Sequence, residues 1–259
     1  MQLWTYEHFI SYVPAIIVII AAAVVMRICF LNKSEWIKLL PVQIIGVILV
    51  VIEIGKQIAS FEGGEYNLYS IPLHYCSLLL FFIPAAAFWR GKYTNATRTL
   101  AVTFGSALFI FMAIYPNLIY SADNVKELFS DYLSAHTVVF HVLASAAFVF
   151  MLLLDLQKPN LKRDFKVVLI GTAAYCVVAA IMAQVLETNF NNFYSCNIPP
   201  LETLRLTIIE AIGYGAGQTI YVVVTLILNL VFTSLAYMFY VGLCKLKALI
   251  FKKVKEKVI

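Results

Sequence analysis

The chain has 259 residues, of which 62% are hydrophobic and 13% are charged. Soluble domains are about half apolar and about a quarter charged, so this composition excludes a soluble globular enzyme, a disordered chain and a disulfide scaffold. The net charge of +5 comes from basic residues dispersed between apolar runs, which excludes a nucleic-acid partner. The class that remains is a single integral membrane domain over residues 1–259.

Seven apolar runs of about 17 to 25 residues follow one another along the chain. Runs of this length predict helices, because membrane-spanning strands are shorter, alternate in polarity and close into a barrel. The predicted spans are residues 9–31, 36–59, 71–89, 99–120, 133–155, 166–186 and 218–244. The connection at 187–217 is rich in Pro and Gly and predicts a structured outer loop with a short interfacial helix. We therefore expect an all-α bundle of seven transmembrane helices, followed by a basic tail at 245–259.

The lysines and arginines predict the orientation of this bundle, because short cytoplasmic loops collect them. Sixteen of the 19 basic residues fall in the first, third and fifth connections and in the tail. Lys126 and Arg205 fall on the opposite side, and Lys56 lies inside a helix. The sequence thus predicts an N-terminus outside and a cytoplasmic C-terminus.

Polar residues are concentrated on one face of the second predicted helix. Gln43, Gly46, Glu53, Lys56 and Gln57 follow a spacing of mostly three, four or seven residues, which places them along one side. Ionisable residues within a membrane are costly and usually face the bundle interior or a water-filled cavity. Glu53 and Lys56 are therefore either a structural pair that neutralises itself or part of a functional site.

Further polar residues gather near the outer ends of the third, fourth and fifth predicted helices. Together with the outer end of the second helix, they predict a pocket between helices two, three, four and five in the outer half of the membrane. The side chains concerned are those of His74, Cys76, Asn117, His136, His141 and Glu53.

Helix geometry limits what this pocket can be. On a regular helix, His74 and Cys76 would point about 200° apart, so a shared site requires an irregular turn after Pro72. His136 and His141 are separated by about 140°, which favours a direct role for one of them and an indirect role for the other.

Three kinds of chemistry fit such a pocket. Cys76 could act as a nucleophile with His136 as its base, through a thioester intermediate. Alternatively, the histidines with Glu53 and Asp131 could hold zinc and activate a water, as in a zinc-dependent intramembrane lipid hydrolase, although the usual helical pair at i and i+4 is absent. The third possibility is a small-solute transporter or binding protein, although seven helices do not divide into equal repeats. The five cysteines form no CxxC pair, so neither a zinc knuckle nor a disulfide framework is predicted.

The segment Ile71-Pro72-Leu73-His74-Tyr75-Cys76-Ser77 resembles the LPLHLC signature of the YwaF-type integral membrane proteins. This family is related to the eukaryotic transmembrane protein 164, a cysteine-dependent acyltransferase that moves acyl chains between phospholipids. The resemblance covers residues from about Gly46 to Tyr240. Other features that agree in order are Glu53, Pro116, Ser134-Ala135-His136, Thr188-Asn189-Phe190 and Pro200-Leu201-Glu202.

By that resemblance, Cys76 is the acyl-accepting nucleophile and His136 is its partner. The resemblance implies an acyltransferase or acyl hydrolase in a bacterial plasma membrane, with phospholipid or lysophospholipid substrates and with no cofactor or metal. We expect the outer loop with Thr188, Asn189 and Asn192 to cover the pocket. Supporting or substrate-binding roles are expected for His74, His141, Glu53, Lys56, Asn117 and Asn189.

Overall fold

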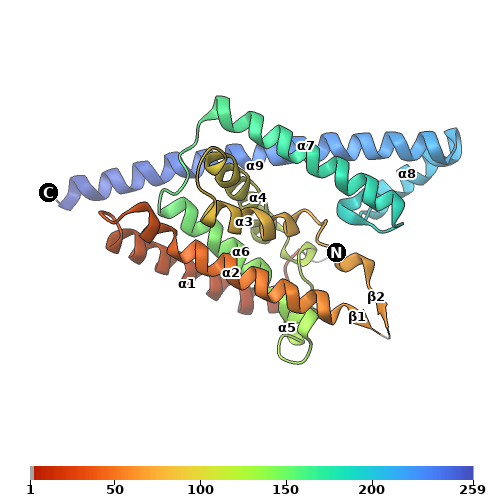
Figure 1. Ribbon diagram of the computed structural model, residues 1–259. Helices are drawn as coiled ribbons and strands as arrows, with labels where there is room; N and C mark the ends of the chain where they lie inside the picture. Colours follow the sequence, from red (N-terminus) through yellow and green to blue (C-terminus); the bar gives the residue numbers. More distant parts are fainter. Residues whose placement is uncertain (1–2, 63, 259) are drawn as a thin grey trace.

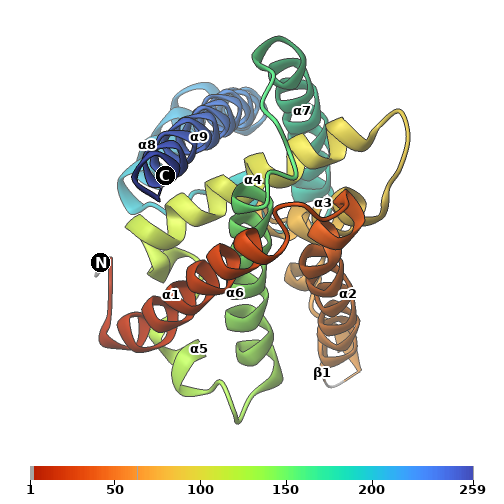
Figure 2. The same cartoon turned by 90° about the vertical axis from the view of Figure 1, so that its left-hand side faces the viewer.

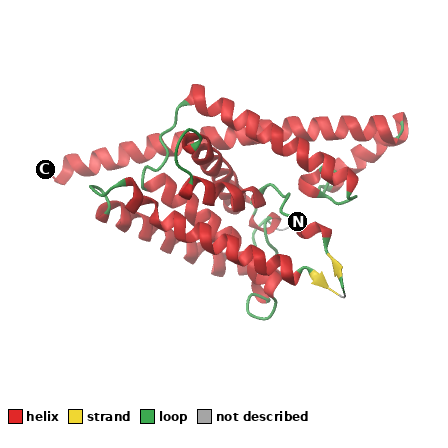
Figure 3. Ribbon diagram, in the orientation of Figure 1, coloured by secondary structure: helices red, strands yellow, loops and turns green. Residues whose placement is uncertain are grey.

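The computed structural model describes residues 3–62 and 64–258 (Figure 1). Within these residues, six helices are long and apolar enough to cross a membrane. They are α1 (Tyr6–Cys29), α2 (Glu35–Ala59), α4 (Thr94–Ile114), α6 (Tyr132–Leu153), α7 (Leu161–Val185) and α9 (Tyr214–Val258). Helices dominate the fold (Figure 3). The protein is therefore a helical, multi-pass integral membrane protein.

The run at 71–89, which the sequence predicts as a span, is not one continuous helix. Its first five residues are irregular, η2 (Cys76–Leu78) is a 3₁₀ turn, and α3 (Leu79–Phe88) has ten residues. At 1.5 Å per residue, α3 is about 15 Å long, which is half the hydrocarbon thickness of a bilayer. The physical reason is Pro72, which lacks an amide hydrogen and disfavours helical geometry at the residue before it. The predicted count of seven spanning helices is not confirmed.

The segment that contains α3 runs antiparallel to α2. Gln57, near the end of α2, donates a hydrogen bond to the carbonyl of Ser70 at 3.0 Å. Gln43, earlier in α2, donates to the carbonyl of Ala87 at 3.3 Å. Gly46 lies between them, where an added Cβ would come within 3.3 Å of the α3 backbone. The polar face of α2 that the sequence indicates is therefore turned toward this segment.

The centre of the molecule is occupied by α4, which passes between two groups of helices (Figure 2). It packs against α3 and α6 on one side and against α7 and α9 on the other. On the first side, α1 and α2 both contact α6, and on the second side α9 contacts α7 and α8. We call these two groups the α2–α6 side and the α9 side.

The outer connection at 187–217 contains η4 (Phe190–Asn192) and α8 (Pro199–Ile212). Gly213 has a φ of +85°, a conformation that other residues rarely adopt, and it lets the chain turn from α8 into α9. Gly217 brings α9 close to α8, since an added Cβ would lie 2.8 Å from the α8 backbone. Two glycines thus make the α8–α9 hairpin possible.

The last helix is longer than the sequence predicts. It begins at Tyr214 and has 45 residues, which corresponds to about 68 Å. The expected basic tail at 245–259 is therefore helical through residue 258, and it extends past the rest of the bundle (Figure 1). Residue 259 lies outside the described residues.

Ion pairs join the helices at the basic end of the molecule. Asp155, after α6, accepts hydrogen bonds from Arg27 of α1 at 2.6 Å and from Lys247 of α9. Arg98, near the start of α4, pairs with Glu35 at the start of α2 at 2.5 Å. The starts of α2 and α4 therefore lie at the same end of the bundle.

Short elements complete the fold at the opposite end. A two-stranded antiparallel hairpin follows α2, and Asp131 caps the start of α6 by accepting the backbone N–H of Ser134. The short elements are β1 (Phe61–Glu62), β2 (Glu65–Tyr66), η1 (Leu68–Ser70), η3 (Pro116–Leu118) and α5 (Ala122–Lys126).

Candidate active site

The irregular turn after Pro72 positions both His74 and Cys76. The carbonyl of Leu73 lies outside any helix, and the hydroxyl of Tyr175 on α7 donates a hydrogen bond to it at 3.0 Å. Non-helical backbone within a membrane protein is tolerated when protein groups satisfy it in this way. His74 and Cys76 line the same cavity, which a regular helix would not allow.

This cavity has a volume of about 540 Å³ and lies on the α9 side of the molecule. Its walls come from the segment 69–76, α4, the loop after α7, α8 and α9. Most of the lining is apolar, as with Phe111, Leu204, Val224 and Phe232. The size and the apolar walls are typical of a ligand site. We call it the Cys76 cavity.

His74 is held in this cavity by a hydrogen bond at one of its two ring nitrogens. Its Nε2 lies 3.0 Å from the carbonyl oxygen of Tyr69. Because a carbonyl only accepts, Nε2 carries a proton, and in the neutral imidazole the lone pair is then on Nδ1. The ring also lies against Tyr69 and Phe190, with centroid distances of 4.3 and 5.7 Å. This arrangement orients a neutral imidazole as a proton acceptor.

A second polar group, the Glu53 network, lies on the α2–α6 side. Glu53 is buried, and its Oε1 accepts hydrogen bonds from Lys56 at 3.0 Å and from Gln57 at 2.6 Å. Its Oε2 lies 3.0 Å from Nε2 of His136 on α6. Gln57 is fixed in turn by the hydroxyl of Tyr66. A buried carboxylate is tolerated here because several donors and a cation surround it.

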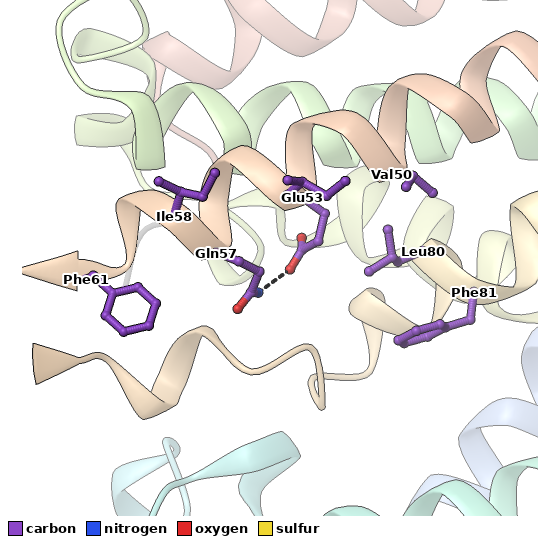
Figure 4. A pocket seen from close by; sticks show the side chains of 8 residues that line it. Val50, Glu53, Gln57, Ile58, Phe61, Leu80 and Phe81 are labelled. Atoms are coloured by element: carbon purple, nitrogen blue, oxygen red, sulfur yellow. Dashed lines mark hydrogen bonds between the residues drawn. The ribbon is translucent and has the colours of Figure 1, made fainter.

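The Glu53 network faces a shallow groove between α2 and α3 (Figure 4). Apart from Glu53 and Gln57, the groove is lined by apolar side chains, among them Val50, Leu80 and Phe81. Its volume is about 670 Å³. Glu53 and Gln57 point from α2 toward this space, whereas Cys76 and His74 line the other cavity.

His141 is buried on α6, the helix that also carries His136. Its Nδ1 donates to the carbonyl of Thr137 at 2.6 Å, and within the described residues its Nε2 has no hydrogen-bond partner. Its ring lies edge-on to Phe140, with a centroid distance of 5.4 Å. In this part of the structure, no hydrogen bond joins His141 to His74 or to His136.

The structure divides the predicted site residues between these two groups. Cys76, His74 and Asn189 line the Cys76 cavity. Glu53 and Lys56 belong to the Glu53 network with His136. Asn117 lies in η3, and the two residues that follow it, Leu118 and Ile119, line the Cys76 cavity. Among the described residues, no hydrogen bond connects Cys76 to any histidine.

The donor geometry required by the zinc alternative is not observed. In the part of the chain that the structure describes, no group of three or more His, Cys, Asp or Glu side chains is arranged to hold a metal ion. Cys29, Cys76, Cys176, Cys196 and Cys244 are all free thiols. Of these thiols, Cys76 and Cys196 line the Cys76 cavity.

Comparison with known proteins identifies the family. The model of the TMEM164 family matches residues 3–241, a range that includes both polar groups. The chain belongs to the TMEM164 family. No curated protein and no solved structure matches the chain.

One charged residue of this TMEM164 family member was assigned no site role by the sequence. Arg205 on α8 lines the Cys76 cavity, and its side chain is 9% exposed. It forms a two-pronged ion pair with Glu202 at 2.5 and 2.8 Å and donates to Gln218 of α9 at 2.8 Å. Hydrogen bonds from Arg205 hold the pKa of the Glu202 carboxyl below its ordinary value. One feature of the sequence could have pointed to Arg205. It is one of the few basic residues outside the predicted cytoplasmic connections and tail.

The loop after α7 also contributes side chains to the Cys76 cavity. Asn191 and Asn192 both have positive φ angles, of 50° and 62°, a conformation that Asn tolerates better than most residues. The Asn191 amide donates to Asn229 of α9 at 2.9 Å. Asn189 accepts from two backbone N–H groups of the same loop. These contacts fix the loop along one wall of the Cys76 cavity.

Proposed function

We propose that the protein is a membrane-embedded, cysteine-dependent acyltransferase or acyl hydrolase that acts on the acyl chains of phospholipids. The observation that carries this proposal is the Cys76 cavity. Within it a thiol and an oriented imidazole, His74, share a largely apolar space inside a membrane protein. Membership in the TMEM164 family adds support.

The reaction requires one proton carrier and one nucleophile. His74 Nδ1 takes the proton of the Cys76 thiol, and the sulfur attacks the ester carbonyl of a phospholipid. The C–O bond breaks, the lysophospholipid alkoxide takes the proton from His74, and the acyl chain remains on Cys76 as a thioester. An acceptor hydroxyl then gives its proton to His74 and attacks the thioester, which restores the thiol. With water as acceptor, the product is a free fatty acid.

Two histidines, His74 and His136, are each oriented by a hydrogen bond, as a general base requires. Tyr69 orients His74, and Glu53 orients His136. The role of His136 as the base remains a prediction from the sequence. We assign the thiol proton to His74, since it lines the Cys76 cavity, and assign the Glu53 network with His136, Lys56 and His141 a supporting electrostatic role.

We further propose that the segment between α2 and α4 crosses the membrane. This segment starts beside the end of α2 and returns to its start, where Glu35 meets Arg98. It therefore passes through the bundle with α3 as its helical half. With seven crossings, the N-terminus lies outside and the end of the last helix lies in the cytoplasm. The distribution of lysines and arginines along the chain favours the same orientation. For a bacterial chain, the membrane is the plasma membrane.

The test is intact mass spectrometry of the purified protein after incubation with a phospholipid of defined acyl chains. We expect a mass increase of one acyl chain that is removed by hydroxylamine and is absent in Cys76→Ala. Cys29→Ala, which removes an exposed thiol at the end of α1, is the matched control and keeps the adduct. Unchanged lipid turnover by Cys76→Ala would contradict the proposal.

A further inference from the structure

The part of the Cys76 cavity between α8 and α9 has apolar walls that the protein leaves exposed. Leu204 of α8 and Ile220, Val224 and Leu228 of α9 line the cavity, and all four are exposed. The three α9 residues are four positions apart, so they form one stripe along the helix. Unlike an ordinary lipid-facing surface, this stripe lines a concavity that also contains a thiol. We call this part of the cavity the α8–α9 groove.

Two contacts between α8 and α9 close the groove at its far end. Arg205 of α8 donates a hydrogen bond to Gln218 of α9 at 2.8 Å, and its guanidinium is fixed by the ion pair with Glu202. At the preceding position of α9, an added Cβ on Gly217 would lie 2.8 Å from the Cα of Ile209, so the two helices touch there. The groove therefore ends at the level of Gln218.

Aromatic rings close the cavity at its other end, near the reactive segment. Phe111 of α4 lies against Phe232 of α9, with a centroid distance of 4.7 Å. Beyond this pair, a buried hydrogen bond joins α4 to α9. The hydroxyl of Tyr75, next to Cys76 in the chain, lies 2.9 Å from Oγ1 of Thr233. Cys76 is thus near the closed end at Phe232, and the cavity continues from there along α9 toward α8.

The distance between the two ends suits an extended hydrocarbon chain. Gln218 and Phe232 are fourteen positions apart, which corresponds to about 21 Å along α9. The acyl chains of one lipid leaflet fill about 15 Å, half the hydrocarbon thickness of a bilayer. A chain of the length found in membranes therefore fits between the two ends.

We propose that the α8–α9 groove holds the acyl chain carried by Cys76, and that its length selects which chain is transferred. This inference rests on the proposed function, because the thioester on Cys76 identifies the occupant. The chain follows the stripe that contains Ile220 and Val224, where apolar surfaces cover each other. At the far end, further methylene groups would bury the polar side chains of Arg205 and Gln218, which is unfavourable. Chains that reach beyond Gln218 are therefore poor substrates.

The first test narrows the groove at two positions. Intact mass spectrometry measures the rate of adduct formation from phosphatidylcholines that carry octanoyl, lauroyl or palmitoyl chains. We expect Val224→Trp to lower the rate with palmitoyl chains by about 10- to 100-fold, the cost of overfilling a packed space, and to leave the octanoyl rate unchanged. Ile220 lies farther from the reactive end, so Ile220→Trp should accept longer chains than Val224→Trp does.

Val223→Trp is the matched control for these variants. Val223 is 50% exposed and Val224 is 47% exposed, but Val223 does not line the cavity. Its chain-length profile should equal that of the unmodified protein. The inference is overturned if the three Trp variants share one profile, or if Val224→Trp slows octanoyl and palmitoyl transfer equally. Size-exclusion profiles establish that all variants fold.

A second measurement separates this inference from the proposed function. In a Cys76→Ser background, a phosphatidylcholine with a photoreactive diazirine at the end of a palmitoyl chain is crosslinked, and the labelled peptides are mapped. We expect label on the groove face near Ile220, lost in Val224→Trp and kept in Val223→Trp. Label spread evenly around α9 would overturn the inference.

The two measurements together give distinguishable failures. If the label follows the groove but the unmodified protein never forms an adduct, the proposed function fails while acyl-chain binding in the groove stands. If adducts form on Cys76 without any dependence on chain length in the Trp variants, the inference fails while the proposed function stands.

Discussion

The two polar groups of this protein differ in how far their hydrogen-bonding capacity is used. In the Glu53 network, both carboxylate oxygens are engaged with donors from α2 and α6. In the Cys76 cavity, the bonds observed among the described residues involve one ring nitrogen of His74 and three of the five N–H donors of Arg205. The first group carries more charge, but the second has the space that a ligand requires.

Ionisable residues within a membrane therefore serve one of two purposes, which are stabilisation of the fold and binding or reaction with a ligand. A closed network compensates the cost of burial by joining helices, as Glu53 joins α2 to α6. An open cavity with partly engaged groups binds or reacts. We therefore expect changes in the Glu53 network to affect stability first, and changes in the Cys76 cavity to affect activity first.

The largest expected effect is on catalysis, from His74→Asn. Loss of the proton acceptor should lower the rate of Cys76 acylation by about 10²- to 10⁴-fold, the usual contribution of a general base. The thermal unfolding temperature should change little, since the ring is at the edge of a cavity. The measurement is the single-turnover rate of adduct formation. A similar loss in His136→Asn with a normal rate in His74→Asn would reverse the assignment of the base.

The next effect is on stability, from Glu53→Leu. This change leaves the Lys56 ammonium without its carboxylate, and removing one partner of a buried pair costs about 3 to 5 kcal/mol. Denaturant unfolding in detergent measures it. The double variant Glu53→Leu with Lys56→Met is the control and should recover much of the loss. If Glu53→Leu has the same free energy of unfolding as the unmodified protein, the Glu53 network does not stabilise the fold. The contrast drawn between the Glu53 network and the Cys76 cavity is then wrong.

A smaller effect is expected at the loop along the cavity wall, from Asn191→Ala. This variant loses the bond to Asn229 and puts Ala, which tolerates a positive φ less well than Asn, at this position, which together cost about 1 to 2 kcal/mol. Acyl-chain selectivity should change before expression does. Asn191→Gly, which accepts the backbone conformation, separates the two causes. Uniform loss of expression without a change of selectivity would assign the loop a structural role alone.

The smallest effect concerns pH and the Arg205–Glu202 pair. Because the pKa of Glu202 is lowered in the folded protein, its stabilisation is complete above the ordinary value of 4.5 and is lost as pH falls through the lower folded pKa. Below pH 4.5, the unfolding temperature of the unmodified protein should therefore approach that of Glu202→Gln. A constant difference between the two across this range would contradict the pairing.

The membrane class follows from the sequence alone, because runs of about 20 apolar residues have few other stable environments. The Pro72-to-Cys76 signature predicts the family, and the TMEM164 match over residues 3–241 confirms that prediction. The polar face of α2 followed from helical spacing alone. Each of these features depends on residues that are close together in the chain, so a local sequence pattern is enough to predict it.

The grouping of the site residues depends on the tertiary structure. The turn after Pro72 brings His74 and Cys76 into one cavity, and its stability depends on Tyr175 from a distant helix. The partner of His136 is Glu53, 83 positions away in the chain. The place of Arg205 depends on the hairpin that Gly213 and Gly217 allow. Such contacts depend on packing between segments far apart in sequence, and spacing within one helix carries no information about them.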